Sequence, residues 1–134
     1  MRPLAALLAL LAALTLASCT SSTDSSSDFE GDQREAASAV EDLQSAAHDD
    51  DASEICRTLL AKTLLDQIEG RGLQCTTVVE KALDAADTTE LDVKSVQVSG
   101  TTATARVESG SGDNATIRTV SLTREGRNWK IASL

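Results

Sequence analysis

Apolar residues recur at helical spacing in the middle of the chain. Over residues 33–49 they are three or four positions apart, the period of an amphipathic helix: Ala36, Val40, Leu43 and Ala47. Asp51 and Glu54 have the spacing of a capping box and predict the start of a second helix, whose apolar residues are Ile55, Cys56, Leu59 and Leu60. Residues 63–68 either continue this helix or form a separate turn before Gly70 and Gly72. The pattern predicts a third helix over about 74–86.

After Thr88 the apolar residues alternate with polar ones, and β-branched residues dominate, which is typical of strands. Residues 91–99 form a first strand with a bulge near Lys94 and Ser95, where the inward set shifts. Three further strands are predicted, with these apolar residues: Ala103, Ala105 and Val107; then Ile117, Val120 and Leu122 over about 115–124; then Trp129 and Ile131 over 129–134. Their short connections predict an antiparallel meander. Helices followed by four such strands indicate an α+β fold in which the helices cover one face of a curved sheet.

The N-terminal segment is typical of a signal peptide. Arg2 supplies a positive charge, and an apolar stretch follows from Leu4 to Leu14. This stretch is too short to span a bilayer, which takes roughly 20 residues. We therefore expect residues 1–18 to be removed during export.

The end of the apolar stretch, Leu16-Ala17-Ser18-Cys19, resembles the lipobox of bacterial lipoproteins. The resemblance implies a diacylglyceryl group on the thiol of Cys19, cleavage just before it, and a fatty acyl group such as palmitate on the new amine. Two acyl chains hold a protein stably on a membrane, at about 0.8 kcal/mol per buried methylene. The alternative is an ordinary secretory signal that leaves Cys19 free. With the lipobox, residues 19–32 are expected to be the lipidated cysteine and a disordered tether rich in Ser and Asp. Residues 33–134 are expected to form a single domain.

The three cysteines fit the same compartment. With Cys19 assigned to lipid, Cys56 and Cys75 remain as a pair in an oxidising location. We expect a disulfide between them. The alternatives are two buried free thiols, or a metal site, although no second Cys or His stands at ligand spacing from either residue.

The apolar pattern from about Val40 to Leu134 resembles the nuclear transport factor 2-like superfamily, the cystatin-like cone found on actinobacterial lipoproteins. The residues that carry the resemblance are Val40, Leu43, Cys56, Cys75, Val96, Val98, Gly100, Ala103, Ala105, Val107, Trp129, Lys130 and Ile131. The resemblance concerns fold more than activity. Enzymes of this superfamily use Asp, Tyr and His in a deep pocket, whereas this chain has no Tyr and a single His.

Composition excludes some functions and leaves few candidate residues for chemistry. The net charge of −9 excludes nucleic acid as a partner, because binding to phosphates needs a basic surface. His48 beside Asp49, Asp50 and Asp51 is interpreted as a solvated helix end, since the spacing fits neither a calcium loop nor a zinc site. Trp129 is a core ring or, as a weak candidate, the wall of a binding cleft. We expect no catalytic residues, metal or cofactor.

These observations predict a membrane-anchored lipoprotein on the extracytoplasmic face of the cell membrane. Its domain would be non-catalytic and would bind a small apolar ligand or lipid with its concave sheet and helices. One alternative is a protein-interaction or regulatory module of the envelope that has no pocket and uses an exposed sheet face. Another is a small enzyme of the cone type. An interior cavity would favour the first function, an exposed patch the second, and inward-facing paired carboxylates the third.

Overall fold

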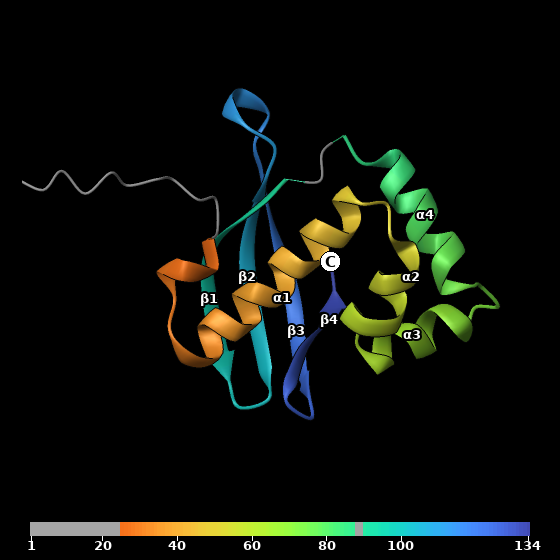
Figure 1. Ribbon diagram of the computed structural model, residues 1–134, viewed down its shortest axis with the longest axis horizontal. Helices are drawn as coiled ribbons and strands as arrows, with labels where there is room; N and C mark the ends of the chain where they lie inside the picture. Colours follow the sequence, from red (N-terminus) through yellow and green to blue (C-terminus); the bar gives the residue numbers. More distant parts are fainter. Residues whose placement is uncertain (1–24, 88–89) are drawn as a thin grey trace, which may run out of the picture.

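The computed structural model describes residues 25–87 and 90–134 (Figure 1). The helical segments, in chain order, are η1 (Ser25–Asp28), α1 (Gly31–His48), α2 (Ala52–Glu54), the π-helical η2 (Ile55–Leu59), α3 (Lys62–Glu69) and α4 (Cys75–Ala85). The strands that follow are β1 (Leu91–Ser99), β2 (Thr102–Ser109), β3 (Thr116–Glu125) and β4 (Asn128–Ser133), with a short 3-10 turn, η3 (Gly112–Asn114), between β2 and β3. No helix in these ranges combines the length and apolar character needed to cross a membrane.

The four strands form one antiparallel sheet in the order β1-β2-β3-β4, so the predicted meander is confirmed. The predicted bulge is also present, because the register between β1 and β2 shifts between Val93 and Ser95. Helix α1 crosses one face of this sheet (Figure 1). The chain therefore has the expected α+β fold, with helices on one face of a four-stranded meander.

Small side chains fill the space between α1 and the sheet. The buried face of α1 consists of Ala36, Ala37, Ala39, Val40, Leu43, Ala46 and Ala47. The strands present Val93, Val96, Ala103, Ala105, Val107, Val120, Leu122, Trp129 and Ile131 to the same core. Alanines on the helix allow its backbone to approach the sheet closely, so the core consists mainly of small side chains. Among the described residues, no buried position is polar or charged.

The second predicted helix is divided by an extended segment. Leu60 has φ −82° and ψ 143°, and it forms a parallel bridge with Ile131 of β4. The N–H of Ala61 donates to the carbonyl of Ile131 at 2.7 Å, after which α3 begins as a separate helix. This segment covers part of the edge of β4, an edge that would otherwise expose unpaired backbone groups.

The folded part of the chain begins earlier than Gln33, where the sequence placed its boundary. Residues 25–28 form η1, and α1 starts at Gly31. The backbone N–H of Ser26 donates to Oε1 of Glu41 at 2.5 Å, and Phe29 packs against the core. Residues 25–32, which were expected to belong to the tether, therefore contain η1 and the start of α1. The predictions for residues 1–18 and for Cys19 lie outside the described residues.

Ile117 differs from the sequence expectation. It was grouped with Val120 and Leu122, but its side chain is 47% exposed while those two are buried. Alternate residues of a strand point to opposite faces, and Ile117 is an odd number of positions from Val120. It therefore lies on the other face of β3, paired in register with Glu108.

Candidate binding site on the open face of the sheet

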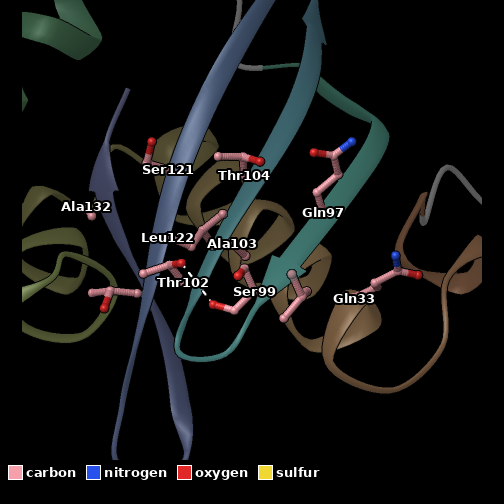
Figure 2. A pocket seen from close by; sticks show the side chains of 11 residues that line it. Gln33, Gln97, Ser99, Thr102, Ala103, Thr104, Ser121, Leu122 and Ala132 are labelled. Atoms are coloured by element: carbon pink, nitrogen blue, oxygen red, sulfur yellow. Dashed lines mark hydrogen bonds between the residues drawn. The ribbon is translucent and has the colours of Figure 1, made fainter.

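The face of the sheet opposite α1 is lined by small polar side chains. Strand β2 alternates exposed and buried residues, so Thr102 and Thr104 face away from the core that holds Ala103 and Ala105. Figure 2 shows the same side of the neighbouring strands, with α1 behind the sheet. We call this side the open face.

An open pocket with a volume of about 730 Å³ lies on the open face (Figure 2). Six of its polar lining residues come from the strands: Gln97, Ser99, Thr102, Thr104, Ser121 and Thr123. Gln33, from the first turn of α1, completes the polar set, and the apolar part is Val98, Ala103, Leu122 and Ala132. None of the eleven described lining residues is charged or aromatic. This open-face pocket is the candidate site.

The register of the sheet arranges the polar side chains in rows. Gln97 pairs with Thr104, and Thr104 with Ser121, so one row crosses three strands. Neighbouring strands in a sheet are about 4.8 Å apart, which sets the spacing within a row. The second row contains Ser99, Thr102 and Thr123. The pocket thus presents a regular array of hydroxyl and amide groups.

Part of this array already makes hydrogen bonds within the protein. Oγ1 of Thr102 donates to the carbonyl of Ser99 at 3.0 Å, and Oγ1 of Thr123 donates to the carbonyl of Thr101 at 3.4 Å. Nε2 of Gln33 donates to the carbonyl of Val96 at 3.0 Å and so fixes α1 to the edge of β1. Within the described part of the chain, the side chains of Gln97, Ser99, Thr104 and Ser121 have no protein partner. Those four are available to a ligand.

The ion pairs of the sheet lie outside the pocket lining. Nζ of Lys94 contacts Asp92 and lies 3.4 Å from Oε1 of Glu108. Hydrogen bonding to Asp92 raises the pKa of Lys94, with Glu108 adding to the effect. The pocket itself is lined by hydroxyls and amides, which form hydrogen bonds but do not change charge near neutral pH.

A carboxylate with a shifted pKa lies on α1. Burial raises the pKa of Asp42, and the nearby charges of Glu41 and Glu54 raise it further. Asp42 is not a lining residue of the open-face pocket. We therefore assign it no part in the candidate site.

Trp129 lies in the core and not in the pocket. It is 5% exposed, and Cζ of Arg124 lies 4.9 Å from the centroid of its ring. Nη2 of Arg124 in turn lies 2.6 Å from Asp32 and 3.1 Å from Glu35, both on α1. The structure thus places Trp129 as a core ring that helps to attach α1 to the sheet, and away from the open-face pocket.

The predicted disulfide is present. Sγ of Cys56 and Sγ of Cys75 are 2.02 Å apart, and the bond links η2 to the start of α4. Neither thiol is therefore free for a metal. The bond and the pocket are at separate places in the fold, because none of the lining residues comes from η2 or α4.

His48 and the three following aspartates form an exposed helix end. Oδ1 of Asp51 accepts a hydrogen bond from the N–H of Glu54 at 2.8 Å, which confirms the predicted cap. Within residues 25–87 and 90–134, no group of three or more His, Cys, Asp or Glu residues is placed to hold a metal ion. The structure brings none of these aspartates to the pocket.

The pocket residues were not singled out from the sequence. The available signal was the alternation of Thr or Ser with apolar residues in β2 and β3, at Thr102, Thr104, Ser121 and Thr123. Such alternation indicates a strand with one polar face, but it does not distinguish a hollowed face from a flat one.

Comparison of the chain with protein-family models, with curated proteins and with solved structures gave no match. The function is therefore inferred from the site.

Proposed function

We propose that this protein is a membrane-anchored, non-catalytic binding protein of the cell envelope. In this proposal, acyl chains on Cys19 hold it on the extracytoplasmic face of the cell membrane, and the open face of the sheet binds the ligand. The arrangement of helices on a meander supports the resemblance to the nuclear transport factor 2-like cone, which we include in the proposal.

The open-face pocket is the observation that carries this proposal. It combines a volume of about 730 Å³ with four polar side chains that no protein group engages. Its lining holds no residue that titrates near neutral pH, which supports binding over acid–base catalysis. The same lining supports a polar ligand better than the small apolar ligand or lipid that the sequence suggested.

The disulfide supports the proposed compartment. Disulfides persist in exported proteins and are rare in the reducing cytosol. With Cys56 and Cys75 joined, Cys19 is the remaining cysteine of the sequence. It is therefore the one thiol that a diacylglyceryl group can modify.

The anchor is tested by Cys19→Ser. The full chain, expressed in a bacterium that processes lipoproteins, is expected to enter the detergent phase on Triton X-114 partitioning and to incorporate labelled palmitate. The serine variant is expected to lose both properties, because it lacks the thiol that carries the lipid. The matched control replaces Cys56 and Cys75 together with serine and should remain in the detergent phase. Retention of C19S in that phase would contradict the anchor.

The binding surface is tested by Thr104→Arg, which places a long charged side chain in the middle of the pocket. The full chain is purified from its own membrane and examined by native mass spectrometry for a species that co-purifies with it. We expect the species to be lost or strongly reduced in T104R. Thr77→Arg adds the same charge at an exposed position of α4 and should leave the species in place. A species bound equally to both variants would contradict the open-face site.

One observation favours a protein partner as a second candidate function. Ile117 is exposed on the same face of the sheet as the pocket, beyond its lining. Isolated exposed apolar residues are common, so this single side chain gives weaker support than the pocket.

A further inference from the structure

We infer that the open-face pocket binds an uncharged polyhydroxylated ligand, namely a segment of neutral glycan. This inference rests on the proposed function and specifies the class of its ligand. Its basis is the combination of unengaged hydroxyl and amide groups, an uncharged lining and an open shape.

The hydrogen-bonding groups of the pocket match those of a sugar. The hydroxyls of Thr104 and Ser121 each donate one hydrogen bond and accept others, and the amide of Gln97 has separate donor and acceptor atoms. These three residues form one row across β1, β2 and β3. Sugar hydroxyls are also both donors and acceptors. A row of such groups can therefore either donate to or accept from each successive hydroxyl along a glycan.

The charge distribution disfavours an anionic ligand. The lining is uncharged, although 25% of the residues of this chain carry a charge. The nearest cation in the register of the open face is Lys130, which pairs with Thr123, but it is not a lining residue and its Nζ donates to the carbonyl of Thr58 instead. Recognition of a phosphate or carboxylate usually employs Arg or Lys in direct contact. The lining offers neither.

The lining also disfavours a lipid. Large apolar or aromatic side chains dominate sites for apolar ligands. Here the apolar part of the lining is one Val, one Leu and two Ala, of which Ala103 and Leu122 are buried in the sheet. An acyl chain on this surface would cover hydroxyls that gain no partner, at a net cost in free energy.

The open shape and the lack of rings predict weak binding. The pocket is open to solvent along the sheet and can accept a segment of a longer polymer. No aromatic ring in the lining can stack on a sugar, so hydrogen bonds exchanged with water provide most of the affinity, and each contributes little net free energy. We expect dissociation constants on the order of 1 mM for one segment, about −4 kcal/mol. Several copies on one membrane would bind a polymer more tightly through multivalency.

The test is an NMR titration of the isotope-labelled full chain in detergent micelles. The probes are two uncharged oligosaccharides, maltohexaose and cellohexaose, and one anionic oligosaccharide, hexagalacturonate. We expect an uncharged probe to shift the backbone amides of Gln97, Ser99, Thr104 and Ser121 in a saturable way. The anionic probe should shift these amides less.

Two substitutions measure the contribution of the row. Thr104→Val keeps the β-branched shape and removes the hydroxyl of β2, and Ser121→Ala removes the hydroxyl that β3 contributes to the row. Each is expected to weaken binding about threefold to tenfold, the effect of one net hydrogen bond. Thr119→Val is the matched control, because Thr119 lies on β3 two residues from Ser121 but outside the lining. It should leave the affinity unchanged.

Three results would overturn the inference. The first is no saturable shift with either uncharged probe at 20 mM. The second is equal or tighter binding of the anionic probe. The third is a set of shifts at the same amides that depends on protein concentration alone, which would assign the face to a second copy of the chain. If any of these occurs while a co-purifying species still depends on Thr104, the proposed function stands and only the glycan fails. If no species depends on Thr104, the proposed function fails as well.

Discussion

Trp129→Ala is expected to lower the free energy of unfolding by about 3–5 kcal/mol, the usual cost of removing a large buried ring. The ring is 5% exposed, and it is the one Trp of the chain. Its neighbours in the core are chiefly Ala, Val and Leu, which have little reach to fill the vacated volume. The substitution also removes the ring under Arg124, the residue that links β3 to Asp32 and Glu35 of α1. Both losses act on the same contact between helix and sheet.

The measurement is urea unfolding followed by far-ultraviolet circular dichroism, because the variant lacks the fluorescent ring. Trp129→Phe, which keeps a ring, is the matched control and should lose less stability. Arg124→Gln separates the two contributions, since it leaves the ring in place and removes the cation. A loss below about 0.5 kcal/mol for W129A, the level of an ordinary surface change, would show that the ring is not a core element.

The strands were predictable because their signal is local. Alternation in β2 identified Ala103, Ala105 and Val107 as its inward residues. In β1 the inward positions shift along the strand, and this shift located the bulge. Side chains of neighbouring residues in a strand point to opposite faces, so a few positions suffice to assign them. The same rule, applied to β3, would have placed Ile117 on the face opposite Val120.

The local pattern did not decide between a continuous second helix and one divided before residues 63–68. Residues 55–68 contain no Pro or Gly, so nothing in the segment itself ends the helix at Leu60. The helix ends because Ala61 donates to the carbonyl of Ile131, a residue far along the chain. The start of the folded part depends on distant partners too, since η1 is fixed by Glu41 and by the packing of Phe29. A local composition rich in Ser and Asp does not encode such contacts.

The candidate site was predictable only in its polarity. The Ser and Thr residues of β2 and β3 indicate a solvated face, and an exposed sheet face was one of the predicted binding surfaces. The pocket itself depends on three-dimensional features: the register that aligns Gln97 with Thr104 and Ser121, and the reach of Gln33 from α1 to the edge of β1. These features determine where the face is hollowed, and no short stretch of sequence encodes them.

Replacing Cys56 and Cys75 together with serine is expected to lower the free energy of unfolding by roughly 3 kcal/mol. The two residues are 19 positions apart, and a loop of about this length gives that value in the chain-entropy description of a disulfide. For a domain of this size the melting temperature should fall by roughly 10 °C or more. Reduction of the unmodified chain should have the same effect, measured by calorimetry with and without a dithiol.

The loss should be concentrated in α3 and α4. Neither helix has a fully buried residue, and their apolar side chains, such as Leu64, Leu65, Val79 and Leu83, only partly contact the core. The disulfide is the covalent link between α4 and η2, which lies deeper in the fold. Without it, opening of this helical pair costs less free energy than opening of the sheet. Hydrogen exchange should therefore accelerate in residues 62–85 under reducing conditions, while the central strands β2 and β3 remain protected. Equal acceleration in both regions would contradict a local role, and unchanged exchange in residues 62–85 would show that packing alone holds the two helices in place.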